Sequence, residues 1–119
     1  MDNVMAQLES LEVRYEEIQE MMVDPEVIAD TKRYMEITKE EADMREVVQK
    51  FRKFKADKEE IAGNKEIIAD GSDPELVEMA KMENSELEDE ISQLEDEIKI
   101  RLLAVAAGDV KIVHIELNA

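Results

Sequence analysis

Positively charged side chains gather in one short stretch near the middle of this 119-residue chain. Closely spaced lysines and arginines can contact the phosphate groups of a nucleic acid or the carboxylates of a protein. The alternative is ion pairing with acidic residues of the same chain, in which each surface pair contributes little. Phe51 and Phe54 interleave with the bases on an apolar face, so the charges fan around the exposed arc of a helix. This basic segment, residues 50–58, contains Lys50, Arg52, Lys53, Lys55 and Lys58.

The remainder of the chain is strongly acidic, which limits where an anionic partner can bind. Aspartate and glutamate together number 32 against 15 lysines and arginines, for a net charge of −17. This balance excludes a general polyanion-coating protein, because binding to phosphates needs a basic surface. It equally excludes attraction of the whole chain to anionic lipid. Contact with phosphate is therefore confined to the basic segment.

The residues needed for a catalytic or metal centre are missing from the sequence. There is no cysteine, and the one histidine, His114, cannot build a catalytic triad or a site with several histidine ligands. Three isolated glycines cannot form a phosphate-binding loop. The glutamates flank the apolar stripes described below and form no Glu-x-x-His pair, so a solvated helix face is the simpler interpretation. We therefore predict that this chain is not an enzyme and that it has no catalytic residue, no cofactor and no metal site.

Apolar residues at alternating steps of four and three predict a first long helix over residues 4–23. This spacing is typical of coiled coils. Asp24 and Pro25 end it, because proline cannot continue a helix and is favoured at the first position of the next one. Residues 25–37 are predicted to form one or two short helical pieces. The stripe of the first helix comprises Val4, Leu8, Leu11, Tyr15, Ile18 and Met22.

A second long helix is predicted over residues 38–69. Thr38 and Glu41 have the spacing of a capping box, which marks a helix start. The three-and-four spacing of the apolar residues includes positions 58 and 65, which are lysines. Their methylene groups can lie on the seam, the line along which the helices pack, while the ammonium groups stay in water. An α-helix rises about 1.5 Å per residue, so thirty-two residues give a helix of roughly 48 Å, a length that suits a coiled coil. The stripe comprises Met44, Val47, Phe51, Phe54, Ile61 and Ile68.

A third long helix, over residues 74–106, follows the clearest break in the chain. Asp70-Gly-Ser-Asp-Pro suits a helix end, an N-cap and a new start at Pro74. The new helix carries eight acidic residues and no base between positions 83 and 97. Its stripe comprises Leu76, Ala80, Leu87, Ile91, Leu94, Ile98, Leu102 and Val105. We interpret the methionines at or beside the seams as core filling: Met21, Met22, Met35, Met44, Met79 and Met82.

These elements predict an all-α fold, an elongated antiparallel three-helix coiled-coil-like bundle with short helices between the first and second long helices. Residues 110–117 are the exception, since their β-branched composition predicts one C-terminal β-strand. A lone strand leaves its backbone groups unpaired, so we expect the chain to be cut from a longer protein. Residues 1–107 are predicted as the helical domain and residues 108–119 as the start of the next, truncated domain.

Neither a signal peptide nor a membrane span is predicted. The N-terminus lacks the basic and apolar regions of a secretion signal, and the longest apolar run, residues 102–108, is far short of a bilayer span. We therefore expect a cytoplasmic protein with no membrane partner.

Several stretches resemble the N-terminal domain of the bacterial class I peptide chain release factors that read UAA and UAG. The resemblance is carried by LEVRYEEI from residue 11, VDPEVI from residue 23, EDEIKIRLL from residue 95 and, most specifically, TKRYMEITKEEADMREVV from residue 31. It covers residues 5 to about 103. Beyond Leu103 the sequence departs from the family pattern, although residues 110–117 still resemble the first strand of the family's next domain.

The resemblance implies an arm-like helical domain that acts in translation termination. In this family the domain reaches toward the stalk base of the large ribosomal subunit, near its rRNA and ribosomal protein L11. In this family the domain is also a surface that is used by the methyltransferase that modifies the factor's catalytic glutamine. The Gly-Gly-Gln hydrolysis motif and the codon-reading tripeptide have no match here. By analogy, the candidate ribosome contacts are Lys50, Arg52, Lys53 and Lys55.

A stand-alone acidic coiled-coil adaptor or tether that binds a protein partner is the alternative interpretation. The two hypotheses differ in oligomeric state. A release-factor domain is expected to be a monomer, because the apolar stripes of its three helices can pack against one another within one chain. An adaptor is expected to self-associate as its concentration rises.

Overall fold

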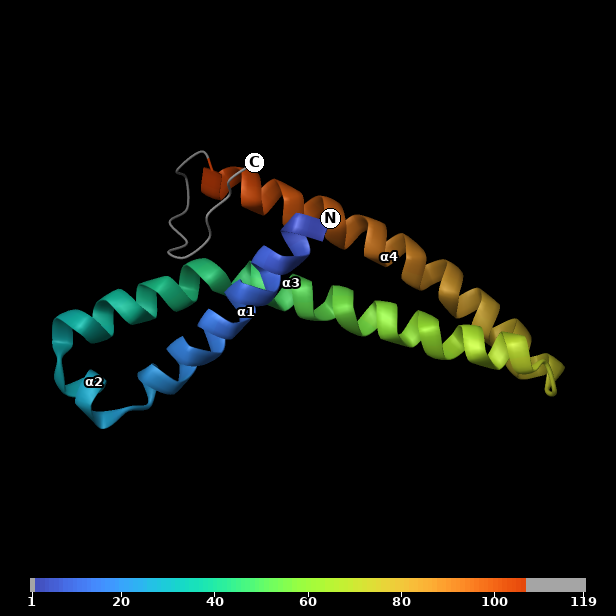
Figure 1. Ribbon diagram of the computed structural model, residues 1–119, viewed down its shortest axis with the longest axis horizontal. Coiled ribbons are helices and arrows are strands. Elements are labelled where there is room, and N and C mark those ends of the chain that lie inside the picture. The colour runs from blue at the N-terminus through green and yellow to red at the C-terminus, as the bar shows by residue number, and fades with distance from the viewer. Residues whose placement is uncertain (1, 107–119) are drawn as a thin grey trace. The chain divides into compact units, whose positions relative to one another are not determined.

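The computed structural model describes residues 2–106, and the side chains of residues 4–104. Four helices follow one another: α1 (Asp2–Met22), α2 (Pro25–Ala29), α3 (Thr31–Asp70) and α4 (Pro74–Ala106) (Figure 1). The chain divides into two compact units. The first unit comprises Met1–Gln49 and Ile100–Ala119, and the second, which we call the hairpin unit, comprises Lys50–Lys99. No helix in the described part of the chain is long and apolar enough to cross a membrane.

The helices start and end where aspartate, proline and glycine punctuate the sequence. Asp24 caps α2 by accepting a hydrogen bond on Oδ1 from the Glu26 amide at 2.9 Å, with Pro25 at the first position. The turn between α3 and α4 contains Gly71 at a φ of +67°, a backbone conformation that favours glycine. Asp73 then caps α4 through the Glu75 amide at 3.0 Å. Both breaks predicted from the sequence are confirmed.

The start of the second long helix was predicted seven residues too late. Asp30 already accepts a hydrogen bond on Oδ1 from the Arg33 amide at 3.2 Å, so α3 begins at Thr31 and runs for 40 residues. Thr38 lies inside the helix, where its hydroxyl donates to the Met35 carbonyl at 3.0 Å. The capping-box prediction was wrong because an aspartate upstream supplies the cap. Only one short helix, α2, remains between the long ones.

The first unit packs the apolar face of α1 together with α2 and with the residues of α3 and α4 that belong to it. Four of the six residues in the predicted stripe of α1 are buried, which confirms the stripe. Arg14 and Tyr15 also hydrogen-bond to α3. The three long helices therefore contribute to one unit here. The buried apolar side chains of the first unit are Leu8, Leu11, Tyr15, Ile18, Val27, Ile37, Met44, Val47, Val48 and Leu102.

The hairpin unit contains two antiparallel helices, which Figure 1 shows as the green-to-yellow part of α3 beside the yellow-to-orange part of α4. Hydrogen bonds join Lys50 to Glu97 and Asn64 to Glu83, so residue numbers rise on one helix as they fall on the other. The buried apolar side chains are Phe51, Phe54, Ile61, Ala80, Leu87, Leu94 and Ile98.

The predicted seam of the hairpin has to be corrected at its polar positions. The buried face of α3 passes through Asp57 and not through Lys58, which is exposed and places its ammonium group over the Phe54 ring. On α4 the buried position after Ala80 is Asn84, at the four-residue step that a coiled coil requires. Of the methionines predicted as core, Met44 is buried, whereas Met35, Met79 and Met82 are exposed.

Gly63 lies inside α3, where a glycine costs about 1 kcal/mol relative to alanine. A Cβ atom placed on Gly63 would meet no other atom within 4 Å. The packing of this chain therefore does not require a glycine at this position.

The predicted fold class is wrong in its β-strand. Residues 2–106, the part that the structure describes, form helices and contain no strand, so the observed fold is all-helical. The strand predicted at residues 110–117 lies outside the described residues. The domain boundary predicted after residue 107 also lies outside them and stays a prediction.

Candidate functional site

Two of the four predicted contact residues form ion pairs with α4 inside the hairpin unit. Lys50 donates from Nζ to Glu97 Oε2 at 2.7 Å. The Nζ of Lys53 lies 3.2 Å from Glu90 Oε1. The intramolecular pairing that the sequence left open as an alternative is therefore realised for these two lysines.

The aromatic rings of the basic segment lie close to the ammonium groups of two of its lysines. Phe51 and Phe54 are buried, and their ring centroids are 6.5 Å apart in a stacked arrangement. The Nζ of Lys55 lies 4.5 Å from the centroid of the Phe51 ring, and that of Lys58 lies 5.0 Å from the centroid of Phe54. Such cation–π contacts hold the ammonium groups near the helix surface. Because the rings are buried, they are unable to stack on nucleic-acid bases, and only the charges are available to a partner.

Asp57, within the basic segment, has a buried carboxylate, and the sequence analysis did not predict this burial. Its side chain is 0% exposed, and neither carboxylate oxygen has a partner of good hydrogen-bond geometry among the described residues. The compensation for its burial is Lys53, whose Nζ lies 3.0 Å from Oδ1. Lys53 therefore neutralises Asp57 first and Glu90 second, and these two carboxylates raise its pKa in that order.

Glu97, the partner of Lys50, stays ionised at neutral pH. The hydrogen bond from Lys50 lowers the pKa of Glu97, and a second hydrogen bond, donated by Gln93 Nε2 at 3.1 Å, lowers it further. A partner that recruits Lys50 must therefore replace a carboxylate that remains charged.

A polar pair crosses the hairpin seam on the turn side of the basic segment. Asn64 donates from Nδ2 to Asn84 Oδ1 at 2.9 Å and to Glu83 Oε1 at 3.0 Å. A hydrogen bond with Glu83 raises the pKa of Glu60, whereas the bond from Asn64 lowers the pKa of Glu83. A polar residue in a coiled-coil seam fixes the register of the helices. The sequence signal was the asparagine four residues after Ala80, which we had not assigned to the seam.

A second polar cluster joins α1 to α3 in the first unit, and its α3 residues lie in the stretch that most resembles the family. Arg14 forms two hydrogen bonds to Glu40, from Nε to Oε1 at 3.2 Å and from Nη2 to Oε2 at 3.0 Å. Tyr15 donates its hydroxyl to Glu41 Oε2 at 2.7 Å, and Arg45 donates to both oxygens of the same carboxylate. Glu41, predicted as part of a capping box, thus fastens two helices together.

The titration of this cluster follows from its contacts. The hydrogen bonds from Arg45 lower the pKa of Glu41 despite its burial, and Tyr15 lowers it further. Burial raises the pKa of the Tyr15 hydroxyl, and its bond to Glu41 adds to that effect. The bond to Glu40 raises the pKa of Arg14. Glu41 and Arg14 therefore keep their charges at neutral pH.

The polar side chains in the described part of the chain form ion pairs and hydrogen bonds. No group of three or more histidine, aspartate and glutamate side chains among these residues is placed to hold a metal ion. The polar clusters are engaged in ion pairs and hydrogen bonds that join helices to one another. The basic segment offers charge on an otherwise acidic chain.

Comparison with known proteins agrees with the resemblance seen in the sequence. The PCRF domain family matches residues 11–119. The chain is 88% identical over 118 residues to a protein named peptide chain release factor 1 from Lactobacillus delbrueckii subsp. bulgaricus, covering 99% of this chain and 33% of the relative. Identity to the proteins of the same name is 67% over 118 residues in Lactobacillus gasseri and 47% over 112 residues in Enterococcus faecalis, covering 99% and 94% of this chain.

These matches cover only part of each relative. The chain spans about a third of the length of the relatives, 33% of that from L. gasseri and 31% of that from E. faecalis. No solved structure matches the chain. Since the family match extends over nearly all of the sequence, the chain belongs to the PCRF domain family.

Proposed function

We propose that the chain works as the N-terminal domain of a peptide chain release factor 1, in the termination of translation at UAA and UAG codons. The observation that carries this proposal is its 88% identity, over 118 residues, to a protein of that name. The described residues offer surfaces and polar clusters that join helices, which suits a domain that binds and positions. The hydrolysis of peptidyl-tRNA would then belong to a part of the factor that this sequence does not contain.

The proposed partner is the large ribosomal subunit at its stalk base, with its rRNA and ribosomal protein L11. The release-factor glutamine methyltransferase is a second proposed partner, and a cytoplasmic location follows from both. The local excess of positive charge in the basic segment supports contact with rRNA phosphates through Lys50, Arg52, Lys53 and Lys55. Lys50 would exchange Glu97 for a phosphate, and Lys53 would exchange Glu90 while it keeps its pair with Asp57. Arg52 and Lys55 carry the other two positive charges of the proposed contact.

Charge reversal at Arg52 and Lys55 tests this contact and leaves the pairs of Lys50 and Lys53 in place. The double variant Arg52→Glu/Lys55→Glu is compared with Lys32→Glu/Arg33→Glu, which makes the same change of charge on exposed residues of the first unit. We expect the first variant to lower the affinity of the chain for large ribosomal subunits by at least about tenfold, and the control by less than about twofold. Co-sedimentation at fixed salt measures both.

Equal losses in the two variants would show that only net charge matters and would contradict the contact through the basic segment. Sedimentation of the chain alone tests the adaptor hypothesis in the same experiment. A sedimentation coefficient that rises with concentration would favour a self-associating coiled coil over a monomeric release-factor domain.

A further inference from the structure

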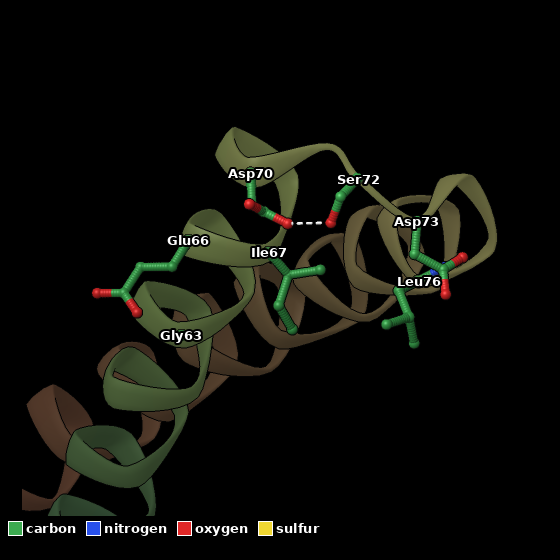
Figure 2. A pocket seen from close by; sticks show the side chains of 7 residues that line it. All are labelled: Gly63, Glu66, Ile67, Asp70, Ser72, Asp73 and Leu76. Carbon is green, nitrogen blue, oxygen red and sulfur yellow. Dashed lines mark hydrogen bonds between the residues drawn. The ribbon is translucent and has the colours of Figure 1, made fainter.

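The hairpin unit carries a cavity at the turn between α3 and α4, beyond the C-terminal end of the basic segment on α3. It has a volume of about 250 Å³. Figure 2 shows its lining, contributed by the last turns of α3, by the turn and by the first turn of α4. We call it the tip pocket, and its lining residues are Gly63, Glu66, Ile67, Asp70, Ser72, Asp73 and Leu76.

Large apolar side chains are exposed at the tip pocket, and they continue beyond it. Ile67 and Leu76 line the pocket and are 39% and 48% exposed. Met79 and Met82 follow Leu76 at intervals of three residues along α4 and are still more exposed. Clustered exposed apolar side chains on a polar surface mark sites of protein interaction. Methionine is common on such surfaces because its side chain adapts to different partners.

Gly63 leaves one wall of the tip pocket without a side chain. A Cβ atom at this position would have no neighbour within 4 Å, so packing within the described part of the chain does not require a glycine here. Inside a helix a glycine is unfavourable, and close approach of another molecule to the backbone is a reason for its presence. The open wall therefore gives room for a side chain from a partner.

The charge around the tip pocket selects the kind of partner. Its charged lining residues are Glu66, Asp70 and Asp73, and no basic residue lines it. Asp70 accepts a hydrogen bond from the Ser72 hydroxyl, Asp73 caps α4, and the Glu66 carboxylate points away from Ile67 (Figure 2). RNA phosphates, anionic lipid and the acidic rim of a second copy would all be repelled. Lysines and arginines would be attracted.

We propose that the tip pocket docks a basic amphipathic segment of a protein partner. An apolar side chain of that segment enters between Ile67 and Leu76, beside Gly63, and its flanking lysines or arginines face Glu66, Asp70 and Asp73. This is the helix-in-groove mode of recognition, in which a few apolar anchors give affinity and the charged rim gives specificity. The inference stands on the hairpin unit alone and does not depend on the proposed function.

A synthetic helical peptide with leucines at every third or fourth position and lysines elsewhere serves as the probe. It is titrated into the 119-residue chain labelled with ¹⁵N, and amide shifts are followed by NMR. We expect the shifts to concentrate on residues 63–82. Gly63→Phe, which fills the pocket, should weaken binding by at least about tenfold, whereas Gly63→Ala should change it by less than about twofold.

A second pair of variants excludes the case in which the new phenylalanine ring turns into solvent. Leu76→Gln should weaken binding by about tenfold, whereas Leu103→Gln, at a still more exposed leucine of the first unit, should leave it unchanged. A peptide with the same lysines but serine in place of leucine should bind at least about tenfold more weakly.

Three results would overturn the docking proposal. Equal binding of the leucine and serine peptides would show simple attraction of a polycation to an acidic chain. Self-association that Gly63→Phe abolishes would show that a second copy occupies the pocket. Amide shifts in residues 63–82 on addition of an RNA oligonucleotide alone, without the peptide, would show a nucleic-acid site. None of these results bears on peptide release, so the proposed function is tested separately.

Discussion

The substitution Lys53→Met is expected to destabilise the hairpin unit strongly, although Lys53 itself is half exposed. Lys53 is the counter-ion of Asp57, whose carboxylate is completely buried and has no other partner of good geometry among the described residues. A buried Asp57 carboxylate without its counter-ion should lower the free energy of unfolding by about 3 kcal/mol. Urea denaturation followed by circular dichroism measures the loss.

Removal of the carboxylate itself is the control for this prediction. Asp57→Leu replaces the buried charge by an apolar side chain and should leave stability unchanged or raise it by about 1 kcal/mol. In that background Lys53→Met should have little further effect, since only the surface pair with Glu90 remains to be lost. If Lys53→Met is as harmful in the Asp57→Leu background as in the parent chain, the ion pair does not explain the stability of the hairpin.

The substitution Glu41→Ala is expected to lower the free energy of unfolding by about 2 to 3 kcal/mol through the first unit. The loss leaves the buried Tyr15 hydroxyl without its acceptor at 2.7 Å and frees Arg45 from both of its hydrogen bonds to the carboxylate. The double variant Tyr15→Phe/Glu41→Ala removes both the donor and the acceptor. The loss of unfolding free energy in this double variant should therefore be smaller than the sum of the losses in Tyr15→Phe and Glu41→Ala. Strict additivity in thermal or urea unfolding would contradict this bond.

The same carboxylate makes the stability of the first unit sensitive to acid. The pKa of Glu41 is lowered in the folded chain from its ordinary value of 4.5, chiefly by Arg45. The unfolded chain therefore binds more protons, and the contribution of Glu41 is present above pH 4.5 and is lost as the pH falls through the lowered pKa. Glu41→Gln should flatten this part of the profile. In the hairpin unit, the lowered pKa values of Glu83 and Glu97 act in the same direction.

Local signals in the sequence were enough to place most helix ends. Pro25, Gly71 and Pro74 act through constraints on one or two backbone angles, so their effect can be inferred without the rest of the structure. The start of α3 was missed because two capping candidates stand near each other, Asp30 and Thr38, and the geometry of the chain decides between them. The seam of α1 was found because its period is regular.

The seam of the hairpin was harder to predict, since two helices determine it together. Asp57 and Lys58 are neighbours in sequence, and the apolar rhythm alone favoured Lys58. The structure buries the aspartate because Lys53 and the facing helix neutralise it, and it exposes Lys58 over the Phe54 ring. For the same reason the sequence left open whether Lys50 and Lys53 serve a partner or the chain itself. The register of α3 against α4, which brings Glu90 and Glu97 to them, decides that they pair internally.

The central claim, that this chain acts as a release-factor domain, is tested most directly by exchange. The matching 118 residues of peptide chain release factor 1 from L. delbrueckii subsp. bulgaricus are replaced by this chain. Peptide release is then measured on purified ribosomes halted at UAA, UAG or UGA. We predict rates at UAA and UAG within about twofold of the parent factor, and none at UGA. A folded chimera that binds ribosomes but releases no peptide at UAA or UAG would contradict the claim.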